Sequence, residues 1–190
     1  MRGNVHFRAR TAPRRAGFRL LLASVFLFVI TLPRQCFADG ASETDIKATY
    51  LYKLAYFVEW PAGAFSSANA PLEIVVLGGD PVASALKQVC QGEKVSEHPL
   101  VVRQERSLGS VGHCHILFVP GSERSRFGEV IQTFGNRSVL TVGDGGSFTD
   151  LGGMIQFTSS GKRVAFKINK AAAGRAGLRL SSKLLRLAEL

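Results

Sequence analysis

The sequence is poor in cysteine, with three cysteines (Cys36, Cys90 and Cys114) among 190 residues. It contains no C-x-x-C pair, the spacing that is typical of thiol redox motifs. It also has no internal repeat, no low-complexity tract and no Pro- or Ser-rich linker long enough to separate two domains. A chain of this length buries a hydrophobic core without metals or many disulfides. These absences favour one compact globular domain.

Catalytic motifs are absent as well. The chain lacks G-x-S-x-G and H-E-x-x-H, and it places no pair of carboxylates in an apolar context. Asp144 and Asp150 flank a glycine-rich loop and could be interpreted as an acid and base pair, but aspartate beside glycine is typical of turns. Lys167 alternates with apolar neighbours in a strand pattern, so we expect it to point to solvent. An enzyme is therefore not expected.

The first 38 residues have the layout of an export signal. An arginine-rich start precedes the apolar run Leu20 to Leu32, which at 13 residues is too short to span a bilayer comfortably. Cys36 and Ala38 supply small residues before a cleavage site. We therefore predict that residues 1–38 are a secretory signal peptide that is removed, and that 39–190 form a single domain.

Much of the basic character of the chain lies in this first segment. Its removal takes away seven of the 24 Lys and Arg residues and none of the 14 Asp and Glu residues, so the formal charge falls from +10 to +3. The remaining charges are mixed and form no basic run, which argues against a nucleic-acid partner. The secretory route is favoured, while the adjacent Arg14 and Arg15 leave twin-arginine export open.

Cleavage after Ala38 removes Cys36 and leaves an even pair of cysteines in an oxidising compartment. We therefore predict a disulfide between Cys90 and Cys114, worth about 3 kcal/mol in the chain-entropy model. The stretch His113, Cys114, His115 suggests a metal site as the alternative. On a strand, however, the two histidines point to one face and the cysteine to the other, so no metal site and no cofactor is expected.

The remaining chain alternates between strand and helix patterns. A capping box opens the first helix, whose apolar residues Ile46, Tyr50, Leu54 and Phe57 recur at helical spacing until Trp60 and Pro61. Alternating strands and helices imply a mostly parallel sheet. The predicted fold is a three-layer α/β domain with a mixed, mostly parallel sheet, a C-terminal β-hairpin and a closing helix. Later strands are expected at 72–78, 99–104, 114–120, 138–144, 152–159 and 162–169, and helices at 80–90, 122–135 and 169–190.

The stretch "TVGDGGSFTDLGGMIQF" (141–157) resembles a phosphate-binding loop but fails both common templates. Phe148 stands where a dinucleotide fingerprint needs its third glycine, and no lysine follows Gly152 and Gly153 as a P-loop requires. The segment that follows is a strand, so no helix N-terminus is available to hold an anion. We predict a structural turn and a partner-facing edge that binds no phosphate, although a shallow small-molecule site at this end of the sheet stays open.

Three stretches together resemble the YfiR/HmsC-like family of exported proteins. They are "ATYLYKLAYFVEWP" early in the domain, "CHILFV" in the middle, and "GGMIQFTSSGKRVAFKINKAAAGRAGLRLSSKLLRLA" at the end. The resemblance covers roughly residues 44 to 188. The aromatic-rich first helix that ends in Trp60 and Pro61, and the ending Ser181-Ser182-Lys183-Leu184-Leu185, carry most of it.

The resemblance implies a regulator in the periplasm of a Gram-negative envelope. Such a protein binds the periplasmic portion of an inner-membrane diguanylate cyclase and represses it, which lowers cyclic di-GMP signalling and biofilm formation. Redox state and an outer-membrane lipoprotein partner would relieve the repression. A homodimer is left open, and the alternative is a periplasmic sensor that binds a small ligand and has no cyclase partner.

Three residues are candidates for partner binding: Trp60, Met154 and Phe157. Tryptophan at the end of a helix beside a proline is often partly exposed, and interfaces are enriched in tryptophan. Met154 and Phe157 lie on the first arm of the predicted hairpin and alternate with polar positions. The competing interpretation of such regularly spaced apolar residues, which applies to Phe57 and Met154, is that they belong to the core.

Overall fold

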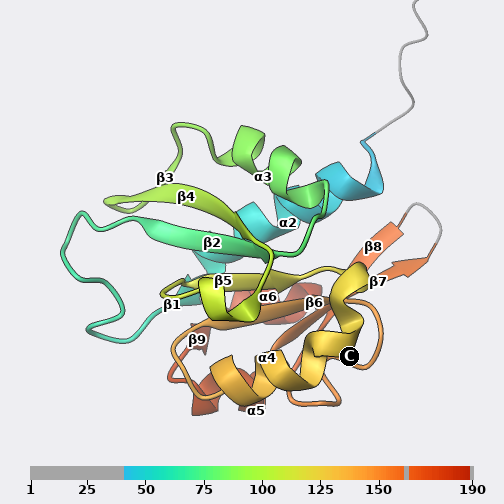
Figure 1. Ribbon diagram of the computed structural model, residues 1–190. Helices are drawn as coiled ribbons and strands as arrows, with labels where there is room; N and C mark the ends of the chain where they lie inside the picture. Colours follow the sequence, from blue (N-terminus) through green and yellow to red (C-terminus); the bar gives the residue numbers. More distant parts are fainter. Residues whose placement is uncertain (1–40, 161–162, 189–190) are drawn as a thin grey trace, which may run out of the picture. The chain divides into compact units, whose positions relative to one another are not determined.

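The computed structural model describes residues 41–160 and 163–188, which belong to one compact unit. Its centre is a seven-stranded sheet in the order β3-β4-β2-β5-β6-β7-β8 (Figure 1). Strands β4, β2, β5, β6 and β7 run parallel, whereas the outer strands β3 and β8 are antiparallel to their neighbours. The mixed, mostly parallel sheet and the C-terminal hairpin, formed by β7 and β8, are confirmed.

The strands and helices follow one another as the alternating pattern predicts. The sheet strands are β2 (Leu72–Leu77), β3 (Lys94–Val95), β4 (His98–Glu105), β5 (Ile116–Val119), β6 (Leu140–Asp144), β7 (Ile155–Ser160) and β8 (Arg163–Ile168). The helices are α2 (Glu43–Phe57), α3 (Val82–Cys90), α4 (Phe127–Phe134), α5 (Lys170–Arg175) and α6 (Ser182–Leu187), with 3₁₀ turns η2 (Leu108–Ser110) and η3 (Gly121–Arg126). None of the described helices is both long and apolar enough to cross a membrane.

Two hydrophobic clusters lie on the two faces of the sheet. Along β2 the residues alternate between them, because Ile74 and Val76 belong to one cluster and Val75 and Leu77 to the other. Helices α2 and α3 cover the first face, and α4 covers the second (Figure 1). This arrangement confirms the three-layer architecture, with both faces of the parallel sheet buried.

The first helix begins as the capping box predicts. The Ser42 side chain accepts a hydrogen bond from the Asp45 backbone N–H, and the Asp45 side chain accepts one from the Ser42 N–H. One turn later Lys47 is buried at 7 % exposure. Its Nζ lies 2.8 Å from Asp144 at the end of β6, and it also pairs with Glu43 at 2.6 Å. The helix is therefore tied to the carboxyl end of a central strand.

The C-terminal segment differs from the single helix that the sequence predicts. Helix α5 ends before Gly177, whose φ of +75° belongs to the left-handed region that favours glycine. The chain then forms a two-residue strand β9 (Arg179–Leu180), which pairs antiparallel with β1 (Val58–Glu59), before α6 closes the domain. The prediction missed this break because the alanines at 171–173 and 176 have a high helix propensity, which outweighed the signal of the nearby glycines.

The glycine-rich loop makes room for an aromatic side chain. Phe148 is completely buried between Gly143 and Gly153. A β-carbon on Gly143 would lie 2.3 Å from the Phe148 ring, and one on Gly153 would lie 2.2 Å from it. Gly145 and Gly152 have positive φ values of +68° and +108°, as expected for a turn. The loop is thus a packed structural element.

We predict that Gly153→Ala lowers the free energy of unfolding by about 1–3 kcal/mol, because the added methyl group overlaps the Phe148 ring. The matched control is Gly128→Ala in α4, where a β-carbon meets no atom within 4 Å. That change should raise stability by about 0.5–1 kcal/mol. Denaturant titration of the two variants and the wild type measures both effects. Equal stability of the Gly153 variant and the wild type would contradict the packing described for Phe148.

Candidate functional site: a groove between α2, β8 and α6

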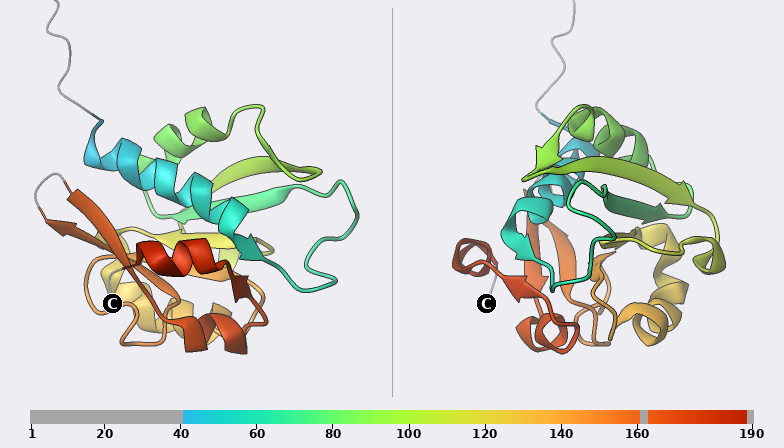
Figure 2. Two further views of the ribbon diagram at one scale, coloured as in Figure 1. Left: turned by 180° about the vertical axis from the view of Figure 1, so that it is seen from behind. Right: turned by 90° about the vertical axis from the view of Figure 1, so that its left-hand side faces the viewer.

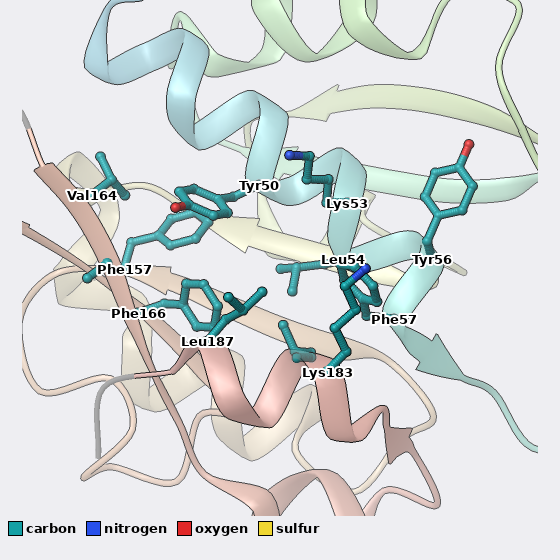
Figure 3. Close-up of a pocket in the computed structure, with 12 residues that line it drawn as sticks. Tyr50, Lys53, Leu54, Tyr56, Phe57, Phe157, Val164, Phe166, Lys183 and Leu187 are labelled. Carbon is teal, nitrogen blue, oxygen red and sulfur yellow. The ribbon is translucent and has the colours of Figure 1, made fainter.

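An apolar groove of about 670 Å³ opens between the first helix, the hairpin and the last helix (Figure 3). Helix α2 contacts both β8 and α6, and Figure 2 shows it running between α3 on one side and the hairpin with α6 on the other. Twelve residues line the groove: Tyr50, Lys53, Leu54, Tyr56, Phe57, Phe157, Val164, Ala165, Phe166, Lys183, Leu184 and Leu187.

The α2 wall of the groove is the stripe that helical spacing predicts. Tyr50, Leu54 and Phe57 face the groove, and only Leu54 among them is fully buried. A second stripe, Ala48, Leu51 and Ala55, has no exposed surface and shares a core cluster with residues of α3. The helix therefore buries its smaller residues completely and leaves its aromatic stripe half covered.

The hairpin supplies the floor. Phe157 of β7 and Phe166 of β8 are paired across the two strands, and both lie on the groove side. The Tyr50 ring packs against both of them, with ring centroids 6.1 Å from Phe157 and 5.6 Å from Phe166. These distances fall in the range of favourable tilted and edge contacts between aromatic rings. The floor is thus a rigid aromatic cluster.

Helix α6 forms the opposite wall. Its N-cap Ser181 accepts a hydrogen bond from the Leu184 N–H, and Leu184 is buried. Leu187, one turn further on, is 58 % exposed although it lines the groove. Tyr56 on α2 is 44 % exposed. Leu187 therefore stays accessible at the mouth of an apolar surface, whereas Tyr56 points away from the groove and its hydroxyl donates to the Lys94 carbonyl oxygen (Figure 3).

The charge of the groove has one sign. Lys53 and Lys183 border it, and no aspartate or glutamate is among its lining residues. The Lys183 Nζ lies 5.7 Å from the centre of the Phe57 ring. Among the described residues neither lysine forms an ion pair with a carboxylate. The groove therefore favours an apolar occupant that carries negative charge.

Two of the three partner-binding candidates are buried, and the third, Trp60, is partly covered as expected. Met154 and Phe157 have no exposed surface, so both are core residues and neither can contact a partner directly. Phe157 lies beneath the surface of the groove as a buried side chain. Trp60 is half-buried and packs edge-on against Phe65 and His115. Its Nε1 is buried and has no hydrogen-bond acceptor in the described part of the chain.

The predicted disulfide is not formed in this structure, where Cys90 and Cys114 are both free and buried. Cys90 ends α3 and belongs to the cluster beneath α2 and α3, whereas Cys114 belongs to the cluster beneath α4. The sheet separates these clusters, a relation that sequence spacing does not reveal. Burial raises the pKa of the Cys90 thiol to about 11 and that of Cys114 to about 12, so both thiols are unreactive at neutral pH.

The histidine stretch has a structural role that the sequence did not predict. His115 Nδ1 accepts a hydrogen bond from the Glu73 backbone N–H, and Nε2 lies 3.2 Å from the Ala64 carbonyl oxygen. Phe65 is stacked between His115 and His98, with ring centroids 4.3 Å and 3.7 Å away. The stack fastens the segment between β1 and β2. In the described residues no group of three His, Cys, Asp or Glu side chains is placed to hold a metal.

The carboxyl end of the sheet is occupied by protein side chains. A β-carbon on Gly78, after β2, would meet the Glu123 carboxylate at 2.4 Å, so an acidic group fills the space where doubly wound sheets bind phosphates. The Arg124 Nε donates to the Asp144 carbonyl oxygen beside Gly145. The Asp144 carboxylate pairs with Lys47, which gives it a structural role. The two positive side chains near the loop are Lys47 and Arg124. The sequence analysis missed them because they belong to segments that are distant from the loop in the sequence.

We predict that His115 makes the protein less stable as the pH falls. Burial, and then the neighbouring His113, lower the pKa of His115 from 6.5 to about 4. His115 in the unfolded chain therefore binds a proton below about pH 6.5, whereas in the folded chain it binds one only below about pH 4. The free energy of unfolding consequently falls as the pH decreases between these values. His115→Asn keeps an acceptor for the Glu73 N–H without this titration. Its stability deficit at pH 7.5 should shrink toward pH 4.5 in denaturant titrations, and a constant deficit would contradict the role of His115.

Comparison with known proteins assigns the chain to a family. The model of the YfiR/HmsC-like family matches residues 44–189, and no curated protein matches the chain. The family suggests periplasmic regulators of cyclic di-GMP signalling rather than enzymes. The match runs from the first helix, through the sheet and the groove, to the last helix. The chain therefore belongs to the YfiR/HmsC-like family.

Proposed function

We propose that the protein is an exported repressor that binds the periplasmic portion of an inner-membrane diguanylate cyclase through the groove between α2, β8 and α6. The observation that carries the proposal is an uncovered apolar groove on a member of a regulator family. Binding would lower cyclic di-GMP and hence biofilm formation. The protein acts by contact and performs no chemistry of its own.

The groove has the features of a surface that receives a protein segment. Leu187 is exposed at its mouth, and the aromatic floor behind it is packed against the Tyr50 ring. Apolar side chains that insert into such preformed grooves commonly supply most of the binding energy of an interface. The floor needs no rearrangement before a partner binds, so little conformational entropy is lost.

The lysines indicate what the partner segment carries. Lys53 and Lys183 border the groove without a carboxylate partner in the described chain, so a segment with apolar anchors and an acidic residue matches both the floor and the rim. An outer-membrane lipoprotein that relieves the repression, or a second copy of this chain, would act on the same contact. It would either compete for the cyclase segment or cover the groove that binds this segment.

Export places the protein where this partner is found. We propose that residues 1–38 direct export and are removed, so that the mature domain begins at Asp39; this segment lies outside the described residues. The alternative function is a periplasmic sensor that binds a small ligand without touching a cyclase. It is favoured by one observation, because the volume and apolar lining of the groove are also those of ordinary small-molecule sites.

A complementation experiment tests the repressor hypothesis. A strain that lacks the gene and contains the candidate cyclase receives the wild type, Leu187→Asp or Leu151→Asp, and cyclic di-GMP is measured. Leu187 and Leu151 are 58 % and 57 % exposed, but only Leu187 lines the groove, whereas Leu151 lies in the glycine-rich loop, so recovery with its variant would also exclude that loop from the interface. We expect cyclic di-GMP to rise on deletion, to stay high with Leu187→Asp and to return to its original level with Leu151→Asp.

Periplasmic abundance and thermal stability of both variants are measured alongside, so that loss of function is separated from loss of protein. Unchanged cyclic di-GMP on deletion would refute repression. Full repression by a stable Leu187→Asp protein would refute the groove as the docking surface. Affinity capture from envelope extracts that recovers no cyclase would favour the small-ligand alternative.

A further inference from the structure

The groove also has the composition of a site for a small amphipathic anion. Its aromatic and aliphatic residues form one continuous apolar lining, in which Figure 3 shows Tyr50, Phe157, Phe166 and Leu187 gathered together. Lys183 lies beside Leu54 and Phe57, and Lys53 borders the same opening from α2. An apolar interior with a few polar groups at its edge is the usual design of a small-ligand site.

We propose that this groove binds a medium-chain alkyl carboxylate, that is, a monomeric fatty acid. The alkyl chain lies against Tyr50, Phe57 and Leu187, and the carboxylate lies at Lys53 and Lys183. The inference concerns the isolated protein and does not rest on the repressor function. Where the repressor function holds as well, the same ligand displaces the partner segment, because both occupy one groove.

The apolar lining of the groove determines which kind of ligand tail it accepts. Tyr50 and Phe57 are half-covered and Leu187 is exposed, so these three side chains offer the accessible apolar surface. The buried rings of Phe157 and Phe166 support Tyr50 from beneath. A flexible alkyl chain adapts to a groove of about 670 Å³ that is open along one side. Each added methylene group that leaves water should strengthen binding by about threefold to fourfold.

The two lysines at the edge of the groove, Lys53 and Lys183, determine which head group it favours. The lining contains two cationic side chains and no carboxylate, so a cationic head group is repelled and a neutral one gains no electrostatic attraction. Both lysines are exposed, which allows them to turn toward an incoming anion without breaking an ion pair in the described chain. Affinity should therefore decrease as salt increases, because the contact is accessible to solvent.

Calorimetric titration of the purified mature protein tests the inference with probes kept below their micelle concentrations. Octanoate, decanoate and dodecanoate should bind at a single site with affinity that rises along the series. Decyltrimethylammonium should bind at least tenfold more weakly than decanoate. No saturable binding of dodecanoate, or equal binding of the carboxylate and the ammonium compound, would overturn the proposal.

Variants locate the site. Lys53→Glu combined with Lys183→Glu should weaken dodecanoate binding by about tenfold, whereas Lys87→Glu on α3, outside the groove, should leave it unchanged. Leu187→Asp should weaken binding and Leu151→Asp should not. Thermal denaturation shows that each variant is folded. Wild-type affinity in the folded lysine double variant would place the carboxylate elsewhere and refute the proposed site.

The two proposals fail separately. A protein that represses the cyclase but binds no alkyl carboxylate refutes only the ligand proposal. A protein that binds dodecanoate in the groove and leaves cyclic di-GMP unchanged on deletion refutes only the repressor proposal.

Discussion

The ion pair between Lys47 and Asp144 fixes the position of the first helix, and the functional surface depends on that helix. Burial by itself would lower the pKa of Lys47, but its hydrogen bonds to Asp144 and Glu43 outweigh this effect and raise it. The lysine therefore stays charged, and removing Asp144 would leave the more exposed Glu43 as its remaining carboxylate partner among the described residues. Helix α2 forms one wall of the groove, so this pair anchors the helix that carries the wall.

The fold leaves the groove uncovered because α2 has more apolar surface than its neighbours bury. One stripe, Ala48, Leu51 and Ala55, is completely covered in the core shared with α3. The other stripe, with Tyr50, Leu54 and Phe57, meets a short six-residue helix, α6, which is too small to cover it. An aromatic stripe is thus accessible beside two lysines. The same uncovered surface serves both a protein segment and an alkyl carboxylate, which provides a direct route for a small molecule to control a regulator.

Sequence reasoning succeeded where the determinants are local. The capping box of Ser42 and Asp45 and the alternation of the hairpin both lie within a few residues of the feature that they specify. The aromatic stripe on α2 was also predicted. Its helical spacing was correct, but spacing does not tell how completely each residue is covered by distant elements.

The features that were missed depend on long-range contacts. Lys47 and Asp144 are 97 residues apart, and nothing near Lys47 in the sequence predicts a buried lysine. The glycine-rich loop was expected to be a structural turn, but its sequence does not reveal that Gly143 and Gly153 leave space for the Phe148 ring. The disulfide was predicted from the number of cysteines, but pairing depends on which face of the sheet each cysteine occupies. The groove itself joins α2 to β8 and α6, which begin more than 100 residues after α2 ends.

Photo-cross-linking in living cells tests the central claim most directly, which is that regulation proceeds through this groove. A photoreactive amino acid is placed at position 187 in the groove, and at position 151 as an equally exposed control. We expect position 187 to cross-link to an inner-membrane protein that contains a diguanylate cyclase domain, and position 151 to give no such product. Cross-linking of the cyclase from position 151 but not from position 187 would contradict the account.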